Sequence, residues 1–239
     1  MPYDEKRFSD IELNLAEVKE KIAEAAIKSG RNPDDIQLMA VSKTVESRFI
    51  NHAISCGVNL IGENKVQEFL LKEPELDLSE CKAHLIGHLQ SNKVKKIVGK
   101  VDVIQSVDSV PLAQEIARRS IQNGIVSKIL LEINVGNEES KFGFDLSEVY
   151  DRVCEISDID GVSIQGLMCV APICSDEKKL RSIFSNMYRS YLDIASKKIN
   201  NVNMNVLSMG MSGDYCEAIL EGANLVRVGS AIFGSRNYR

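Results

Sequence analysis

The stretch QLMAVSKTVES, residues 37 to 47, begins with apolar residues and then places Lys43 between two hydroxyl side chains. A continuous apolar run that ends in this way is typical of a strand buried on both faces of a sheet. The ammonium group of a lysine cannot simply join a hydrophobic core, and a turn does not require one. Lys43 is therefore either an ordinary surface residue at the end of a strand or an amine placed there for a chemical task.

Seven further β-like runs follow this one, and segments with helical periodicity separate them. The eight runs are IQLMAV from residue 36, NLIG from 59, AHLIG from 83, DVIQSV from 102, KILLEINV from 128, SIQGLMCV from 163, MNVLSM from 204 and NLVRVG from 224. Apolar strands that are each followed by a helix predict a parallel sheet covered by helices. Eight such units predict an α/β fold, a single (β/α)8 TIM-type barrel domain over residues 1–239. A doubly wound open sheet is the alternative, but it normally has fewer strands and leaves its edges to be explained.

An extra amphipathic helix is predicted before the first strand, over residues 9 to 28. Its apolar residues recur at helical spacing, at Ile11, Leu15, Val18 and Ile22. Ser9 with Glu12 matches a capping box that would begin this helix, and Gly30 followed by Pro33 would end it.

Composition narrows the class of protein. The 239 residues carry a formal net charge of −5 and are 44% hydrophobic, enough to bury a substantial core. No apolar run approaches the roughly 20 residues of a membrane span, and the N-terminus lacks the apolar stretch of a signal peptide, so we expect a cytoplasmic protein without a membrane partner. The six cysteines form no CxxC pair and the three histidines are not clustered, so we expect free thiols and no metal. The acidic balance argues against nucleic acid as a partner, and we expect a monomer.

Polar residues at strand ends can meet in a barrel, because the carboxyl ends of all strands face one mouth. The predicted strands place the following residues in or near these ends: Lys43, Glu63, Asn64, His84, Asn134 and Ser208. The last two loops, SMGMSGD at 208 to 214 and RVGSAIFG at 227 to 234, are rich in small residues. Their glycines let backbone N–H groups approach a phosphate, and Ser208, Ser212 and Ser230 can donate hydroxyl hydrogen bonds. Barrel phosphate sites commonly use these two loops, although glycine and serine are also common in plain turns.

Closure of the barrel would bring Lys43 close to these loops, since the first and eighth strands become neighbours. An amine near a second cation such as Arg227 loses its proton more easily and can attack an aldehyde to form a Schiff base. The Lys43 amine and the two phosphate-binding loops together would hold a phosphorylated aldehyde. Pyridoxal 5'-phosphate (PLP) is the most common cofactor of this kind. Arg227 has two interpretations, a structural ion pair or a partner that would keep the cofactor ring nitrogen unprotonated.

Several motifs, in order from about residue 36 to the C-terminus, together resemble one protein family. They are AVSKT, GENKVQE, HLIGHLQSNK, INVGNEESKFGF, GLM and LSMGMSGDYCEAILEGANLVRVGSAIFGSR. The chain is similar to the pyridoxal phosphate homeostasis protein family, whose members resemble the N-terminal barrel of alanine racemase. The resemblance implies a PLP-binding barrel with Lys43 as the Schiff-base lysine and Arg227 at the pyridine nitrogen.

The resemblance also implies the other cofactor-binding residues. They are Asn64 and His84 near the ring, and Ser208, Met209, Ser212, Gly229 and Ser230 around the phosphate. The chain departs from the family pattern at two places. Lys65 replaces the usual aromatic after GEN, and Ala83 and Leu85 replace both aromatics of WHFIG, which would change ring packing and the polarity of the mouth.

Three functions are compatible with these features. The first is a protein of PLP homeostasis that carries PLP without efficient turnover, with PLP-dependent apo-enzymes as candidate recipients. The alternative is a PLP-dependent amino-acid racemase, which needs acid–base groups on both faces of the substrate α-carbon. In the racemase relatives a second domain supplies one of these groups, and we expect no residues for it in this chain. The third is a cofactor-free aldolase using Lys43, in which the eighth-strand arginine has no obvious part.

Overall fold

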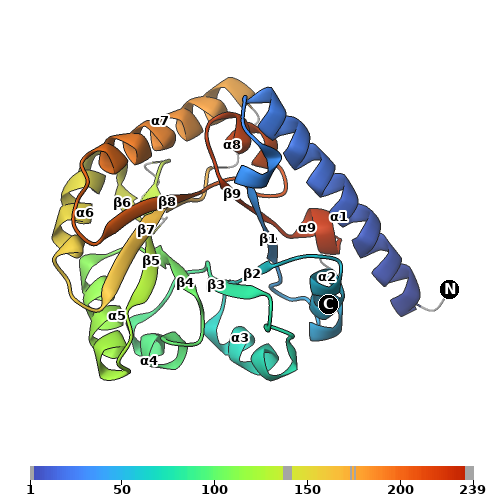
Figure 1. Cartoon of the computed structure of the whole chain (residues 1–239), viewed down its shortest axis with the longest axis horizontal. Helices are drawn as coiled ribbons and strands as arrows, with labels where there is room; N and C mark the ends of the chain where they lie inside the picture. The colour runs from blue at the N-terminus through green and yellow to red at the C-terminus, as the bar shows by residue number, and fades with distance from the viewer. Residues whose placement is uncertain (1–2, 137–141, 173, 175, 235–239) are drawn as a thin grey trace.

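The computed structural model describes residues 3–136, 142–172, 174 and 176–234. Parallel strands form a ring that helices surround, as Figure 1 shows. The strands pair in the order β1-β2-β3-β4-β5-β7-β8-β9, and β9 pairs again with β1, so the sheet closes. The predicted TIM-type barrel is therefore confirmed, and closure removes the edges that an open sheet would leave.

Each of the eight predicted runs forms one strand of the barrel wall. These strands are β1 (Gln37–Val41), β2 (Leu60–Glu63), β3 (Lys82–Leu85), β4 (Val103–Val107), β5 (Ser127–Asn134), β7 (Val162–Cys169), β8 (Val202–Ser208) and β9 (Leu225–Val228). A two-residue strand, β6 (Phe144–Asp145), was not predicted, and it pairs with the last two residues of β5 outside the ring. Five of the twelve residues of the INVGNEESKFGF motif, 137–141, lie outside the described residues.

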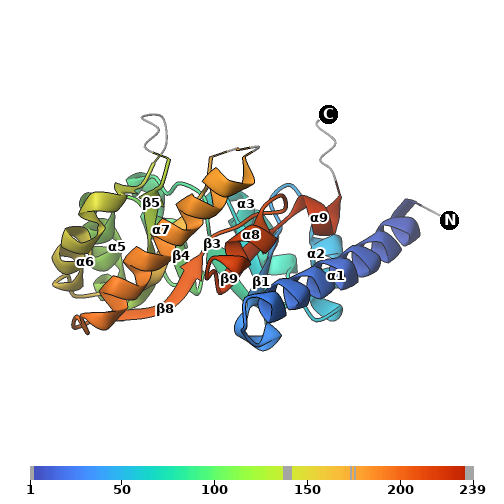
Figure 2. The same cartoon turned by 90° about the horizontal axis from the view of Figure 1, so that it is seen from above.

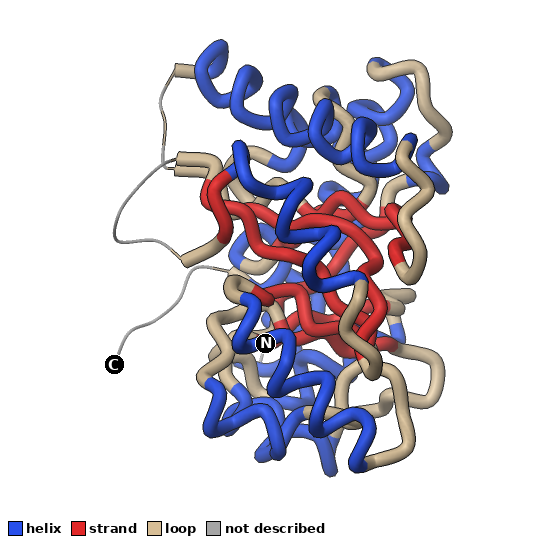
Figure 3. The backbone as a smooth tube through the Cα atoms, turned by 90° about the vertical axis from the view of Figure 1, so that its left-hand side faces the viewer, coloured by secondary structure: helices blue, strands red, loops and turns tan. Residues whose placement is uncertain are grey.

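Helices cover the outside of the ring, as the blue segments around the red strands show in Figure 3. They are α1 (Tyr3–Lys28), α2 (Ser47–Ser55), α3 (Val66–Lys72), α4 (Val94–Ile97), α5 (Val110–Gln122), α6 (Val149–Ser157), α7 (Glu177–Ser196), α8 (Tyr215–Leu220) and α9 (Ser230–Phe233). Among the described residues, none of the helices combines the length and the apolar character needed to cross a bilayer.

The extra N-terminal helix is present, but it begins earlier than predicted. Helix α1 starts at Tyr3, so Ser9 lies inside the helix and the predicted cap at Ser9 is wrong. The added turns are held by packing, because the Phe8 ring lies 5.2 Å from that of Phe49 and 4.5 Å from that of His52 on α2. Tertiary contacts of this kind commonly outweigh a local capping preference.

Helix α1 lies on the outside of the barrel, where its first and last strand–helix units meet. Figures 1 and 2 both show it beside α9, and it also packs against α2 and α8. The Asn14 amide donates to the carbonyl of Ile232 at 3.0 Å. After the helix ends, the Arg31 guanidinium donates to the carbonyl of Ala223 at 2.8 Å. These contacts fasten the first helix to the last strand–helix unit.

The barrel wall divides the core in two. Outward-facing strand residues and helix residues form one large cluster. Two smaller buried clusters contain no helix residue and therefore fill the inside of the barrel. They are Met39, Leu60 and Leu225, and Val103, Leu130 and Met168, with Val206 packed against both. Because side chains alternate along a strand, these residues show which positions face inward.

Candidate functional site

The inward-facing positions lead directly to the predicted site. Met39, Leu60 and Leu225 face into the barrel, so every second residue after each of them should face the same way. These residues are Val41 and Lys43 after Met39, Gly62 and Asn64 after Leu60, and Arg227 and Gly229 after Leu225. Gly62 confirms this phase, since a Cβ there would lie 2.5 Å from the Met39 Sδ atom. The same alternation carries β8 from Val206 to Ser208. Lys43, Arg227 and the loop after β9 therefore belong to the same end of the barrel.

Lys43 lies two residues beyond the end of β1 and is half-buried. Its neighbour Ser42 is fully buried and faces outward, with Oγ 2.7 Å from the Glu63 carboxylate. Lys43 lines a pocket of about 690 Å³ together with Val41, Gly229 and Ser230. Residues of α1, among them Arg7 and Asp10, close its other side, and Arg227 and Ser212 do not line it. The structure thus brings the lysine of the first strand to the loop after the last one, as barrel closure predicted.

The loop after β9 lies close to β1 because Gly229 has no side chain. A Cβ at Gly229 would lie 3.3 Å from both Cβ and O of Val41, tighter than ordinary contact. The backbone N–H groups of Gly229 and Ala231 point to one acceptor, the Ser212 Oγ, at 3.1 and 3.4 Å. Ser212 belongs to the loop after β8, so the two predicted phosphate loops meet. Two convergent N–H groups, a hydroxyl and a nearby lysine are a donor set that suits a phosphate.

Arg227 is 4% exposed and lies inside the barrel. Its Nη1 donates to Ser208 Oγ at 2.6 Å and its Nη2 to the Cys169 carbonyl at 2.7 Å. Among the described residues no carboxylate lies within 4 Å of this guanidinium, so the ion-pair interpretation of Arg227 is not supported. Burial lowers the pKa of Arg227, but arginine stays protonated in proteins. The hydrogen-bond partners of this buried cation are therefore neutral, and the carboxylates of Glu132 and Asp214 act on it from farther away.

A chain of hydrogen bonds runs from Arg227 across the barrel. Ser208 Oγ donates to Gln105 Oε1 at 2.7 Å, and Gln105 Nε2 lies 2.8 Å from His84 Nδ1. His84 is buried, and burial lowers its pKa to about 4. His84 is therefore a neutral imidazole at neutral pH. Hydrogen bonds through Gln105 and Ser208 connect it to Arg227.

Glu132 is a second titratable group inside the barrel. It follows Leu130 by two residues on β5 and therefore faces inward. Burial raises its pKa to about 7, the carboxylate of Asp108 adds to the rise, and Arg227 opposes it. The sequence interpretation did not single out Glu132 or Gln105. Each is a polar residue within an apolar strand run, which is the same signal that identified Arg227.

The remaining predicted site residues occupy different places. Asn64 follows β2 and is half-buried, with its backbone against Gly87, where a Cβ would lie 2.3 Å from the Asn64 carbonyl oxygen. Ser230 is exposed beside Gly229. Met209 packs its side chain into the outer core, and its N–H donates to the Leu225 carbonyl at 3.2 Å, so both groups are engaged away from the mouth.

Several expectations need correction. Glu63 is the last residue of β2 and faces outward to α3, because it is one residue out of phase with Gly62. It therefore does not join the mouth. Ala83 and Leu85 also pack in the outer core, so the aromatics that they replace would not have faced the ring from these positions.

Outside the mouth, one group of described residues has the ligand types of a metal site. Glu12, His52 and Cys56 lie between α1 and α2. His52 Nε2 is 2.9 Å from a Glu12 carboxylate oxygen, and Cys56 Sγ is 3.8 Å from the same nitrogen. Glu12 is more than half exposed, and its contact with His52 accounts for the grouping without an ion.

Comparison with known proteins adds to this geometry. The profile of the family described as "Alanine racemase, N-terminal domain" matches residues 13–237. A curated relative, the pyridoxal phosphate homeostasis protein of Aquifex aeolicus (strain VF5), is 40% identical over 227 residues, covering 94% of this chain and 97% of that protein.

Two solved structures extend the comparison. PipY of Synechococcus elongatus PCC7942, with PLP bound, is 34% identical and superposes with a TM-score of 0.77, covering 89% of this chain and 100% of that one. An alanine racemase of Clostridium difficile 630 is 14% identical with a TM-score of 0.75, covering 95% of this chain and 57% of that one. At 14% identity the second likeness concerns the fold alone.

Proposed function

Because the chain belongs to the pyridoxal phosphate homeostasis protein family, we propose that it binds PLP in the barrel mouth, holds it on Lys43 as a Schiff base and acts in PLP homeostasis without efficient turnover. One observation carries the proposal. Lys43, Gly229 and Ser230 line a single pocket between helix α1 and the rim of the barrel, where the first and last barrel strands meet. An amine and an anion-binding loop in one pocket are what a phosphorylated aldehyde requires.

The loops after β8 and β9 bind the phosphate. The N–H groups of Gly229 and Ala231 already converge on the hydroxyl oxygen of Ser212, so an anionic oxygen in that region would find the same donors. The Ser212 hydroxyl can turn and donate to it, since a serine both donates and accepts. These groups hold and orient the cofactor but take no part in bond changes.

Arg227 faces the ring nitrogen in this proposal. Arginine can only donate hydrogen bonds, so a pyridine nitrogen in contact with it must keep its lone pair and stay unprotonated. When bound, PLP supplies an aldehyde that condenses with primary amines and a ring that can accept electrons. A ring that Arg227 keeps unprotonated accepts electrons poorly, which favours storage over conversion of amino acids.

Lys43 makes the covalent link. Its neutral Nζ forms a bond to the aldehyde carbon, the two nitrogen-bound protons leave with the carbonyl oxygen as water, and a C=N bond remains. The same exchange in reverse, with an amine or water as the incoming group, releases the cofactor. PLP-dependent apo-enzymes are the recipients that we propose.

The first experiment treats PLP-loaded protein with borohydride and maps the labelled peptide, for wild type, Lys43→Ala and Lys65→Ala. Lys65 is an exposed lysine at the start of α3 and serves as the matched control. We expect a visible absorption band and a label on Lys43 in wild type and Lys65→Ala, and neither in Lys43→Ala. A protein that cannot be loaded with PLP, or that is labelled equally well in Lys43→Ala, would contradict the proposal.

A second experiment separates carriage from catalysis. Loaded protein is mixed with a PLP-dependent apo-enzyme, and the recovery of that enzyme is compared with the rate at which PLP dissociates into buffer. Transfer faster than dissociation supports delivery, whereas equal rates limit the protein to buffering. Conversion of L-alanine to D-alanine at about 1 s⁻¹ or faster would instead identify a racemase.

A further inference from the structure

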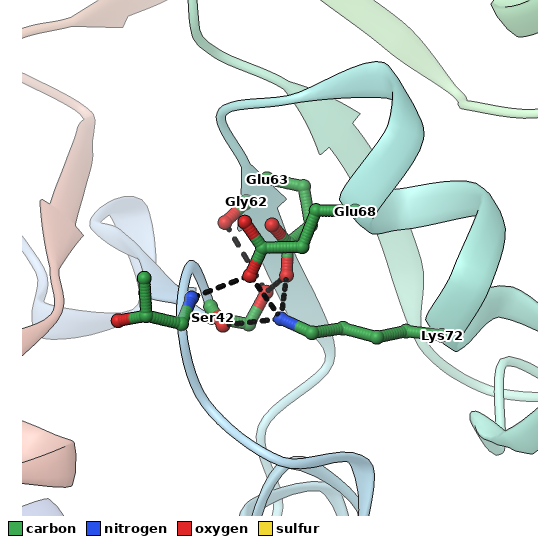
Figure 4. Close-up of polar contacts among 6 residues, drawn as sticks. Ser42, Gly62, Glu63, Glu68 and Lys72 are labelled. Atoms are coloured by element: carbon green, nitrogen blue, oxygen red, sulfur yellow. Dashed lines mark hydrogen bonds and ion pairs between the residues drawn. The ribbon is translucent and has the colours of Figure 1, made fainter. Parts of the chain in front are cut away.

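A group of polar and charged residues lies outside the barrel wall. It fills the space between helix α3 and the ends of strands β1 and β2. Figure 4 shows its members, Ser42, Glu63, Glu68 and Lys72. Glu63 is 1% exposed, and the Lys72 side chain is 13% exposed. The proposed function uses none of these side chains.

Lys72 is the centre of the group. Its Nζ lies 2.8 Å from Glu63 Oε1, 2.7 Å from Glu68 Oε1 and 2.9 Å from the carbonyl oxygen of Ser42. These three acceptors match the three hydrogens of an ammonium group. Ser42 Oγ adds a further contact to Glu63 Oε1 at 2.7 Å, as the dashed lines in Figure 4 show.

The group forms hydrogen bonds with two peptide units, the one before Lys43 and the one after it. The Ser42 carbonyl, which belongs to the peptide before Lys43, accepts from Lys72. The Thr44 N–H, which belongs to the peptide after Lys43, donates to Glu68. When both flanking peptides are fixed, the direction of the Lys43 Cα–Cβ bond is fixed as well.

Thr44 shows that this turn is held in an unusual conformation. Its φ is +64°, in the left-handed region that a β-branched residue rarely adopts. Such a conformation persists only where surrounding contacts determine it, and the N–H of Thr44 is one of the groups that Glu68 binds. The strained residue therefore lies directly beside the lysine proposed for the chemistry.

The group is also costly to bury. Burial raises the pKa of Glu63, and the hydrogen bond and charge of Lys72 oppose that rise. The second oxygen of Glu63, Oε2, is buried without a hydrogen-bond partner among the described residues. A buried ion pair adds little net stability compared with apolar packing, so its value lies in fixing a geometry.

We infer that Lys72, together with Glu63 and Glu68, is a positioning group that fixes the turn at residues 42–44 so that the Lys43 amine enters the barrel mouth. This inference rests on the proposed function of Lys43. None of the three residues touches the cofactor in this proposal. They act through the backbone of the turn, from the opposite side of the barrel wall.

The test separates covalent capture from non-covalent binding. Ligand-free wild type, Lys72→Met and Glu68→Ala are each given PLP, and the rate of Schiff-base formation at Lys43 is measured. Their affinity for pyridoxine 5'-phosphate, which has an alcohol in place of the aldehyde, is measured in parallel. We expect capture to slow about tenfold or more, as misplacement of a reacting group does, with analogue affinity within about twofold of wild type.

Matched variants control for loss of an ion pair alone. Lys100 binds both oxygens of Glu73, at 2.8 and 2.7 Å, and touches neither flank of the turn, so Lys100→Met should capture PLP like wild type. Glu68→Gln keeps an acceptor for the Thr44 N–H and should retain most of the rate. If Lys72→Met does not fold, Glu68, whose side chain is more exposed than that of Lys72, still allows the test through Glu68→Ala.

Three outcomes would overturn the inference: capture at the wild-type rate in both variants, an equal loss in Lys100→Met, or a parallel loss of analogue binding. Wild type that forms no Schiff base at Lys43 would instead reject the proposed function. In that case, acylation of Lys43 by acetic anhydride in ligand-free protein, followed by peptide mapping, still tests positioning. The acylation rate should then change in Lys72→Met and stay unchanged in Lys100→Met.

Discussion

Arg227 Nη1 donates to Ser208 Oγ across 2.6 Å, and this contact sets the direction of every hydrogen bond that follows it. Because the arginine can only donate, the serine oxygen must accept, and its own hydrogen goes to Gln105 Oε1. The Gln105 amide nitrogen then faces His84 Nδ1, which must accept. A cation on one side of the barrel thus assigns the tautomer of a histidine on the other, with the proton on Nε2.

His84 should remain neutral down to about pH 4, since burial lowers its pKa from 6.5 to about 4. In the unfolded chain this histidine binds its proton at a higher pH. The contribution of His84 to the free energy of unfolding is therefore fully present above pH 6.5 and is lost as the pH falls toward 4. The full loss, reached below pH 4, is roughly 3.4 kcal/mol, because the pKa falls by about 2.5 and each unit corresponds to 1.36 kcal/mol. Denaturant unfolding at pH 7 and pH 4.5 should show a smaller difference in His84→Gln. An unchanged difference, or an imidazole NMR titration near pH 6.5, would refute this expectation.

Glu132 should destabilise the ligand-free protein at alkaline pH. Burial raises its pKa from 4.5 to about 7, so the contribution of this carboxyl to stability is complete below pH 4.5 and is lost as the pH rises through 7. Glu132→Gln, which stays neutral, should raise the free energy of unfolding at pH 8 by up to about 3 kcal/mol, from 2.5 units, and change it little at pH 4.5. Equal effects at the two pH values would show that Glu132 is not desolvated.

Gly166 should tolerate no side chain. A Cβ there would lie 1.8 Å from the Val206 carbonyl oxygen on β8, and its φ is +146°. Gly166→Ala should lower the free energy of unfolding by about 3 kcal/mol or more, or prevent folding. Gly213→Ala is the matched control, because nothing lies within 4 Å of a Cβ at that position. A Gly166→Ala protein as stable as the control would mean that β7 and β8 are farther apart than described.

Ser212→Ala should weaken PLP binding without preventing the link to Lys43. The variant loses the hydroxyl that lies against the N–H groups of Gly229 and Ala231. One charge-assisted hydrogen bond corresponds to about tenfold in the dissociation constant, which titration with pyridoxine 5'-phosphate measures. Ser196→Ala, at the exposed end of α7, is the control. If the two variants bind equally well, the phosphate lies elsewhere.

The strand pattern was sufficient to predict the barrel and the meeting of Lys43 with the loop after β9. Runs of apolar residues located all eight wall strands, including β8, in which only the last two residues are buried. β6 was missed because two residues give no periodic signal. The start of α1 was missed because Phe8 packs against α2, a contact that no local pattern records.

The site was predicted in part, and the limit is again physical. Arg227 stood out as a charge in an apolar run, and Gln105 and Glu132 give the same signal without having been used. Glu63 was assigned to the mouth although alternation from the neighbouring glycine directs it outward. Lys72 and Glu68 form an i,i+4 pair on α3, a pattern usual on solvent-exposed helices, and only the tertiary structure shows that they hold the Lys43 turn.

The closure of the barrel has a consequence for synthesis on the ribosome. β9 pairs with both β1 and β8, and α1 packs against α8 and α9, so α1 and β1 complete their packing only when the later elements α8, β9 and α9 are present. The pocket also needs an early and a late segment to come together, because Lys43 follows β1 and Gly229 follows β9. A growing chain therefore cannot assemble this pocket until β9 and α9 have left the exit tunnel. In the proposed function, PLP capture then coincides with the pairing of β9 and β1 rather than guiding the early steps of folding.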